Sequence, residues 1–447
     1  MKIAVVGMGF VGATVAAGFA EKGHDVVGIE NNLERYTLLH KGKIPFYEPG
    51  LPELFIRNVA EGRLRIEKET AEGVKDPDLE AILIAVGTPP LPDGRPDLGY
   101  VEAAAIEIAK SLDHYAVIVE KSTVPVRTGD WLRNIMQKYI QCDFDVAACP
   151  EFLRESTAVN DFFNPDRIVI GTDSRKAFEV LSELYRSLGA VPIIPMSIEE
   201  AEITKHVSNA MLFQRIAVAQ TVSQLADALE FDYEHVMKGV GLDRRIGPEF
   251  LKAGLVGGFC FPKDREAFVS ILNDAEVYAG LFESVGEVNE RQKQCVVDKI
   301  INMIEEEICG FTTGIGLKRI GVLGLSFKSN TSDVRLSPAI DIIKKLHKYG
   351  ANVIVYDPQA MEEAKHLGRT DSNYKFLLDI TYCNNAYEVA EQSELLAILT
   401  EWKEFADLDL GRILPHVRQI VDARNLFDPM RMKNLGFEYD SMGRPLK

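Results

Sequence analysis

The sequence predicts an α/β protein in which two doubly wound domains are joined by a long central helix and a helical middle domain. Three observations support this fold class. An apolar run at residues 2–6 ends in a glycine-rich turn and then continues with helical spacing. A second strand-like run begins at Arg319, far along the chain. Between them, a capping box at Ser197 opens an amphipathic pattern that reaches Leu229.

Composition narrows the class of protein. A chain of 447 residues is too long for one compact core, so two or three domains are expected. The net charge of −17 disfavours nucleic acid as a partner, although a locally basic site remains open to a small anion. No apolar run is long enough to span a membrane and no signal peptide precedes the first strand, so we expect a cytoplasmic protein without a membrane partner.

The cysteines predict free thiols in a reducing compartment. They stand at positions 142, 149, 260, 295, 309 and 383, without a CxxC pair or a regular spacing. This pattern argues against a disulfide framework and against a structural zinc site, so no metal is expected.

The first predicted strand leads into a turn of the kind that binds dinucleotides. Gly7, Gly9 and Gly12 form a GxGxxG motif: the first permits a tight turn, the second lets a pyrophosphate approach the backbone, and the third lets helix pack on strand. Glu30 ends the next strand, where a carboxylate would bind an adenosine ribose and repel a 2′-phosphate. NAD is therefore favoured over NADP, although Arg35 would soften that preference. A glycine-rich turn without a ligand is the alternative.

Later strands also end in polar residues, where open α/β sheets bind ligands. The apolar run 81–86 ends at Gly87 and Thr88, and the run 116–120 leads to Thr123. Thr123 is expected to position a water or a ribose, although a helix-capping role is equally open.

The strand at 144–148 is followed by Pro150, which suits the first position of a helix. In such a helix Glu151 and Glu155 would lie one turn apart as a like-charge pair. That arrangement is unfavourable unless cations or ligand hydroxyls use it, so we expect a functional role.

The central helix, predicted over 197–229, is expected to connect domains and to provide a dimer face. Lys205 and Asn209 lie one turn apart near its start, so both side chains can reach a common site. Solvated polar residues are the alternative.

A thiol stands among residues that would activate it. Two glycines precede Cys260, and Pro262 followed by an acidic and apolar run predicts a helix that begins near the thiol. The helix amides and Lys263 would favour the thiolate, and Asp264 adds a carboxylate. A small buried side chain is the alternative for a free cysteine.

The predicted domains are an N-terminal NAD-binding domain (1–196), a central helical domain (197–300) and a C-terminal domain (301–447). The first turn of the C-terminal domain lacks the dinucleotide motif, and its basic residues Lys328 and Arg335 suit a different anion. The tail, 431–447, is polar, and we expect its end to be poorly ordered.

Together these segments resemble the UDP-glucose/GDP-mannose dehydrogenase family over almost the whole chain. The motifs that carry the resemblance are the GxGxxG turn with Glu30 and the blocks at 44–51, 86–90, 122–125, 150–153, 260–264, 327–328 with Arg335, and 400–402. The blocks at 122–125 and 422–425 are similar to those of UDP-sugar members. The resemblance implies two Rossmann-like domains and a homodimer or higher oligomer. It also implies that NAD, used twice, oxidises the C6 alcohol of a UDP-sugar, with UDP-glucose as first choice.

The resemblance also implies catalytic roles. Cys260 would trap the aldehyde as a thiohemiacetal and become a thioester, which water activated by Asp264 would hydrolyse. Lys205 and Asn209 would stabilise the developing oxyanions. Glu151 and Thr123 would position an ordered water.

By the same resemblance, ligand contacts are expected between the two Rossmann-like domains, with Arg245 reaching the site from a partner subunit. The cofactor would contact Gly7, Gly9, Phe10, Val11, Gly12, Glu30, Arg35, Gly87, Thr88, Thr123, Glu155, Lys263 and Arg335. The substrate would contact Glu151, Phe152, Leu153, Arg154, Glu155, Lys205, Asn209, Arg245, Phe250, Leu251, Lys252, Ala253, Gly254, Gly258, Lys328 and Arg424.

The sequence departs from the family just before the thiol, where Leu255, Val256 and Phe259 replace a small residue, an aromatic residue and a serine. UDP-N-acetylhexosamine and GDP-mannose therefore stay open as substrates. Two other classes are a two-electron hydroxyacid dehydrogenase and an NAD-binding protein without turnover, but neither needs Cys260.

Overall fold

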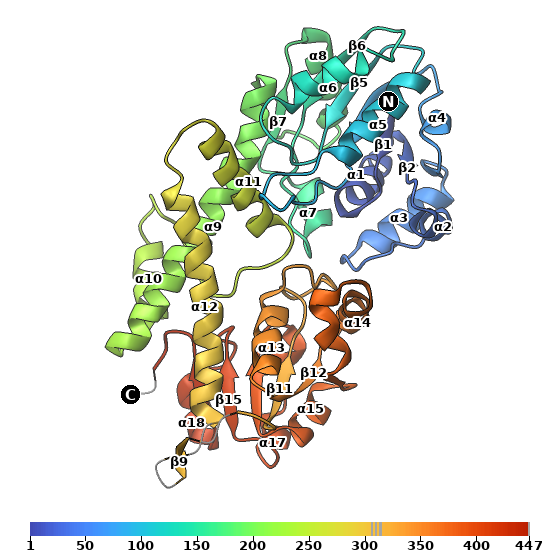
Figure 1. The fold of residues 1–447 in the computed structure, drawn as a ribbon. Helices are drawn as coiled ribbons and strands as arrows, with labels where there is room; N and C mark the ends of the chain where they lie inside the picture. The colour runs from blue at the N-terminus through green and yellow to red at the C-terminus, as the bar shows by residue number, and fades with distance from the viewer. Residues whose placement is uncertain (305–306, 309–310, 313–314, 446–447) are drawn as a thin grey trace. The chain divides into compact units, whose positions relative to one another are not determined.

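The computed structural model describes residues 1–304, 307–308, 311–312 and 315–445, so Cys309 and the last two residues lie outside the described chain. The chain divides into two compact units. The first unit contains Met1–Ser208 and Glu266–Val277, and the second contains Asn209–Arg265 and Tyr278–Lys447. Figure 1 follows the chain through both.

The first unit is built on an eight-stranded sheet with the order β3-β2-β1-β4-β5-β6-β7-β8. Neighbouring strands are parallel except β6 and β7. The strands are β1 (Lys2–Val6), β2 (Asp25–Ile29), β3 (Leu64–Glu67), β4 (Leu79–Ile84), β5 (Ala116–Glu120), β6 (Phe144–Ala148), β7 (Ile168–Gly171) and β8 (Ile193–Met196).

Helices cover this sheet because its strands are apolar toward both faces. In β1, Ile3 and Val5 join one buried cluster, whereas Ala4 and Val6 join another. The helices are α1 (Phe10–Glu21), α2 (Leu33–His40), α3 (Leu51–Ala60), α4 (Thr70–Gly73), α5 (Gly99–Ser111), α6 (Thr128–Met136), α7 (Ala158–Phe163) and α8 (Arg175–Arg186).

The predicted central helix is confirmed as α9 (Ile198–Leu229). Its capping box is present: the Ser197 amide donates to Glu200 Oε2 at 2.8 Å, and the Glu200 amide donates to Ser197 Oγ at 3.2 Å. The central helical region continues with α10 (Tyr233–Gly241), α11 (Cys260–Asp274) and α12 (Gly280–Ile304). A helix that begins at the thiol, as expected, is therefore confirmed.

The second unit contains a six-stranded parallel sheet with the order β13-β12-β11-β14-β15-β16. These strands are β11 (Arg319–Leu323), β12 (Asn352–Tyr356), β13 (Thr381–Tyr382), β14 (Leu395–Ile398), β15 (Gln419–Asp422) and β16 (Glu438–Ser441). A separate antiparallel pair joins β9 (Glu307–Ile308) to β10 (Phe311–Thr312). The predicted second doubly wound domain is confirmed.

The helices of this second α/β domain again follow its strands (Figure 1). They are α13 (Pro338–Lys348), α14 (Met361–Thr370), the 3₁₀ helix η1 (Ser372–Leu378), α15 (Ala386–Gln392), α16 (Lys403–Ala406), α17 (Leu410–Ile413) and α18 (Pro429–Leu435). None of the helices in the described ranges combines the length and apolar character needed to cross a membrane.

The tail is ordered as far as residue 445, and its end, which we expected to be poorly ordered, lies outside the described residues. The chain forms α18 and then β16, the edge strand of the sheet, and Tyr439 and Met442 are buried. Arg444 is also buried, and its Nη2 donates to the Tyr439 hydroxyl at 3.1 Å. Packing against strands that are distant in sequence orders this segment. The local polarity of the sequence gives no indication of this packing.

Candidate active site

The turn after β1 has the geometry that a dinucleotide-binding turn needs. Gly7 has a φ of 90°, where other residues are strained. A Cβ on Gly12 would lie 1.9 Å from the Gly7 carbonyl oxygen, so only glycine permits this close approach. Gly9 is the N-cap of α1, and apart from Gly9 and its two chain neighbours no described residue has an atom within 4 Å of the place where its Cβ would be. The backbone there is open to a phosphate, and Phe10 and Val11 follow in the first turn of α1.

Glu30 is buried at the end of β2, and its carboxylate is held from two sides. Oε2 accepts a hydrogen bond from the Met8 amide at 3.2 Å, and Oε1 accepts one from the Asn32 amide at 3.0 Å. Each oxygen keeps a lone pair for a ribose hydroxyl. Arg35 is exposed in the first turn of α2. The turn and the carboxylate therefore fit NAD.

The ends of β4 and β5 are tied together by hydroxyl groups. Ser122 Oγ donates to the Val86 carbonyl at 2.6 Å, and Thr88 Oγ1 donates to the Thr123 carbonyl at 3.0 Å. The Thr123 side chain is half-buried, and Gly87 is exposed. Two of the predicted cofactor residues, Thr88 and Thr123, are thus brought into contact.

Lys205 and Glu151 form a buried ion pair, with Lys205 Nζ 3.0 Å from Glu151 Oε1. The same Nζ lies 5.4 Å from the centroid of the Phe152 ring. The Leu153 amide donates to Glu151 Oε2. Two of the predicted site residues after β6, Glu151 and Phe152, therefore lie near the amine of Lys205, and Glu151 supplies its countercharge.

The helix predicted at Pro150 does not form, and the next helix, α7, begins only at Ala158. The Glu151 carboxylate accepts from the amide two residues later, and the Arg154 amide donates to Asp161 Oδ2 at 2.9 Å. These side chains use amides that a helix would need. The expected pairing of Glu151 with Glu155 one turn apart is therefore wrong, and Glu155 lies in the turn before α7.

A buried lysine near this pair was missed by sequence reasoning. Lys121 Nζ donates to the Tyr185 hydroxyl at 3.0 Å and to the Pro150 carbonyl at 3.4 Å. Burial lowers the pKa of Lys121 and raises the pKa of the neighbouring Cys149 thiol. Its position just after β5 was the one available signal of a buried role. It was missed because a lysine in that place is usually solvated.

The second unit holds the predicted thiol and its neighbours. Cys260 is exposed at the first position of α11. One turn further on, Asp264 is buried; its Oδ2 accepts a hydrogen bond from Asn209 Nδ2 at 2.6 Å. Its Oδ1 lies 2.7 Å from Lys263 Nζ. The structure thus brings Asn209, Lys263 and Asp264 into one network.

Two aromatic side chains, Phe259 and Phe327, contact residues near the thiol. Lys263 Nζ and the guanidinium carbon of Arg335 lie 5.6 Å and 4.6 Å from the centroid of the Phe259 ring. Gly258 has a φ of 80°, and a Cβ there would lie 2.8 Å from the Phe327 ring. Only glycine allows this close approach.

Side-chain amides from α9 and α12 clamp the segment before the thiol. Asn289 Oδ1 accepts from the Val256 amide at 3.1 Å, and Asn289 Nδ2 donates to the Val256 carbonyl at 2.9 Å. Gln220 Nε2 donates to the Gly254 carbonyl at 2.8 Å and to Asn289 Oδ1 at the same distance. Both amide residues were missed, because glutamine and asparagine in an amphipathic helix carry no local signal of such contacts.

Arg424 braces the second unit through backbone carbonyls. Its guanidinium donates to Leu399 at 2.7 Å, Leu255 at 3.1 Å and Phe327 at 2.9 Å. Glu401 Oε2 lies 3.1 Å from Arg424 Nε. The predicted substrate role of Arg424 stays a prediction, beside this bracing role.

Exposure separates the other predicted substrate residues, whose roles also stay predictions. Exposed side chains are those of Arg154, Arg245 and Lys252, half-buried ones are those of Leu153, Phe250 and Lys328, and buried ones are those of Leu251 and Ala253. Arg245 Nη2 lies 2.7 Å from Asp243 Oδ2. Within the described ranges, no cluster of three His, Cys, Asp or Glu side chains is arranged to hold a metal.

Three sequence profiles of the UDP-glucose/GDP-mannose dehydrogenase family match the chain. The NAD binding domain matches residues 1–189, the central domain 199–291 and the UDP binding domain 321–429. The chain is 40% identical over 450 residues to UDP-glucose 6-dehydrogenase TuaD of Bacillus subtilis, covering 99% of this chain and 93% of that protein. It is 39% identical to UDP-glucose 6-dehydrogenase of Rhizobium meliloti, with 100% of both chains covered.

Solved structures agree in fold. A UDP-glucose dehydrogenase from Pyrobaculum islandicum superposes with a TM-score of 0.88 at 36% identity, covering 98% of this chain and 96% of that one. A UDP-D-ManNAc dehydrogenase from Pyrococcus horikoshii superposes with a TM-score of 0.84 at 26% identity, covering 99% of each chain.

Proposed function

Because the chain belongs to the UDP-glucose/GDP-mannose dehydrogenase family, we propose that it oxidises UDP-glucose to UDP-glucuronate with two molecules of NAD. The observation that carries the proposal is Cys260. Among the described cysteines this thiol alone is exposed, and it opens a helix whose next turn holds the Asn209–Asp264 network. The names of the relatives support UDP-glucose as substrate.

Residues of the first unit would hold the cofactor and prepare the alcohol. The amides at the start of α1 would bind the pyrophosphate and Glu30 the adenosine ribose. Bound NAD would take up the hydrogen and electron pair that leave the substrate carbon in each oxidation. Lys205, held in an ion pair with Glu151, would stabilise the alkoxide as the C6 hydroxyl loses its proton, an effect of about 3–4 kcal/mol per donor.

Residues of the second unit would carry the covalent steps. The Cys260 thiolate, favoured by the N-terminus of α11, would attack the aldehyde carbon and form a C–S bond, while the oxygen takes up a proton. The second oxidation removes the hydrogen of that carbon and the hydroxyl proton, which leaves a thioester. Asp264, oriented by Asn209 and Lys263, would take a proton from water, whose oxygen displaces the thiolate. The sum is one alcohol, two NAD⁺ and one water giving one carboxylate, two NADH and three protons.

An apolar stripe on α9 supports a homo-oligomer. Met211, Val218 and Leu225 recur every seven residues and are 56%, 48% and 49% exposed. We propose that this face packs on a second copy of the chain. A monomer in sedimentation velocity would contradict this.

Stoichiometry tests the reaction. The protein is mixed with NAD and limiting UDP-glucose, UDP-N-acetylhexosamines or GDP-mannose, and NADH is counted per sugar. We expect two NADH per UDP-glucose. One NADH with a free aldehyde would contradict the four-electron reaction, and turnover of another sugar without UDP-glucose would change the substrate.

Cys260→Ser separates the two stages. Without the thiol, the first oxidation should stall at the aldehyde and yield at most one NADH, whereas the matched control Cys295→Ser should still yield two. Intact-protein mass spectrometry after mixing with substrate should show an adduct on the control and none on Cys260→Ser. Unchanged turnover by Cys260→Ser would reject the covalent route.

A further inference from the structure

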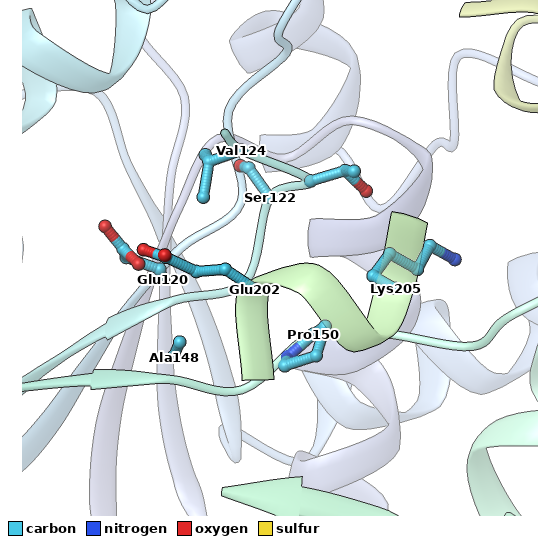
Figure 2. A pocket seen from close by; sticks show the side chains of 8 residues that line it. Glu120, Ser122, Val124, Ala148, Pro150, Glu202 and Lys205 are labelled. Atoms are coloured by element: carbon cyan, nitrogen blue, oxygen red, sulfur yellow. The ribbon is translucent and has the colours of Figure 1, made fainter. Parts of the chain in front are cut away.

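Two buried carboxyl groups lie together in the first unit, and the proposed reaction uses neither of them. Glu120 is the last residue of β5 and is 2% exposed, and Glu202 on α9 is 3% exposed. Figure 2 shows their carboxyl groups turned toward one another, while the amine of Lys205 points away from them.

Only one of the two carboxyls has backbone donors. Glu202 Oε2 accepts a hydrogen bond from the Arg127 amide at 2.6 Å, and its Oε1 accepts one from the Gly129 amide at 2.8 Å, both at the start of α6. Within the described ranges, no N–H or O–H of any residue but Glu202 itself is placed to donate to either oxygen of Glu120, and both oxygens are buried. An ionised Glu120, buried without a hydrogen-bond donor, would be strongly unfavourable, whereas a protonated Glu120 can donate a hydrogen bond to Glu202.

The surrounding charges agree with this distribution of the proton. Burial, and then the Glu202 charge, raises the pKa of Glu120 well above its ordinary value, while burial raises the pKa of Glu202 to about 7. Arg133 opposes the rise at Glu120, but its guanidinium also pairs with Asp130 at 3.0 Å and therefore shares its charge. Glu199, on the same helix as Glu202, adds further negative charge.

The pair lies close to Thr123 and Lys205, two residues to which the proposed reaction assigns roles. Glu120 precedes Thr123 by three residues, and Glu202 precedes Lys205 by three. All four line one cavity of about 10 Å³, too small for more than a single water. His206 Nε2 adds a second link between α9 and the turn, 2.8 Å from the Val124 carbonyl.

We propose that Glu120 and Glu202 share one proton and act as a positioning pair that joins β5, α6 and α9. Glu120 donates the shared proton, and Glu202 keeps the negative charge that the first amides of α6 bind. The turn with Thr123 and the helix with Lys205 are thereby held in register. Only the link to catalysis rests on the proposed function; the pair itself does not.

Infrared spectroscopy tests the pair without substrate. At about pH 8, where an ordinary glutamate is ionised, the wild-type protein should show the carbonyl band of a protonated carboxylic acid, and the band should shift in D₂O. Glu120→Gln should remove it, Glu202→Gln should move it, and the exposed control Glu102→Gln should leave it unchanged. A spectrum without the band, or a band that survives Glu120→Gln or ignores Glu202→Gln, overturns the proposal.

Kinetics then test the positioning role. A glutamine at 120 can still donate, so Glu120→Gln should lower kcat less than about threefold. Glu202→Gln removes the charge that holds α6 and the carboxyl group that titrates near neutral pH, so it should lower kcat about tenfold and flatten its dependence on pH, with smaller changes in KM. Equal losses and unchanged pH profiles in both variants overturn the positioning role. If no nucleotide sugar is oxidised but the infrared band behaves as expected, the proposed function fails and the pair stands.

Discussion

Phe259 contacts two cationic side chains next to the thiol. Its ring lies 5.6 Å from Lys263 Nζ and 4.6 Å from the guanidinium carbon of Arg335. Arg335 is further held by Asp333, with Nη2 2.7 Å from Oδ2. The aromatic ring thus helps to hold two side chains that are expected to contact the cofactor.

Phe259→Ser is predicted to weaken NAD binding. Each cation–π contact contributes about 0.5–1 kcal/mol, so the loss of both should raise the dissociation constant of NAD about fivefold to thirtyfold in titration calorimetry. Phe259→Tyr keeps the ring and is the matched control. Tighter binding by the serine variant would show that the ring obstructs the cofactor.

At the level of elements, the amide clamp joins α9 and α12 to the segment before the thiol. Asn289 is 4% exposed and satisfies both polar backbone groups of Val256. Gln220, fully buried on α9, extends the same clamp to Gly254. Because this segment has no regular secondary structure, its shape depends on these side chains.

Asn289→Ala should therefore loosen the segment locally. It leaves a buried N–H and a buried C=O of Val256 without their partners, which costs about 2 kcal/mol. Hydrogen exchange of the peptide that contains Val256 should then be about 30-fold faster. Asn302→Ala, on the exposed side of α12, is the control and should change nothing. Equal exchange in both variants would mean that the clamp is not what orders the segment.

At the scale of the whole molecule, the buried carboxyl pair makes stability depend on pH. Both pKa values are raised above those of the unfolded chain, that of Glu202 from 4.5 to about 7. A raised carboxyl pKa means that the folded protein binds protons more tightly. Its contribution is complete below the unfolded pKa and is lost as pH rises through the folded pKa.

We predict that, between about pH 5 and about pH 8, the melting temperature of the wild type falls relative to that of the double variant Glu120→Gln/Glu202→Gln. Glu202 accounts for about 3 kcal/mol of the corresponding change in the free energy of unfolding, at about 1.4 kcal/mol per pKa unit. Differential scanning calorimetry of both proteins across that range measures the effect. A constant difference between the two melting curves would contradict the raised pKa values.

Local patterns were sufficient for the strands near 2–6, 81–86, 116–120 and 144–148, for the helix at Cys260 and for the capping box at Ser197, because each depends on residues only a few positions apart. The GxGxxG turn and Glu30 were predictable for the same reason. The resemblance supplied the roles of the thiol and its neighbours, and the structure adds the direct contact of Asn209 with Asp264.

What local patterns could not supply involves residues that are distant in sequence. The helix expected at Pro150 is absent where the carboxylates of Glu151 and Asp161 bind backbone amides, and the tail is ordered by packing on a sheet that its own residues complete. The proton between Glu120 and Glu202 is of the same kind: a lone glutamate is ionised at neutral pH, and only folding removes water and brings a second carboxyl beside it. Spacing along the chain therefore determined the elements, and burial against remote segments determined the charge states.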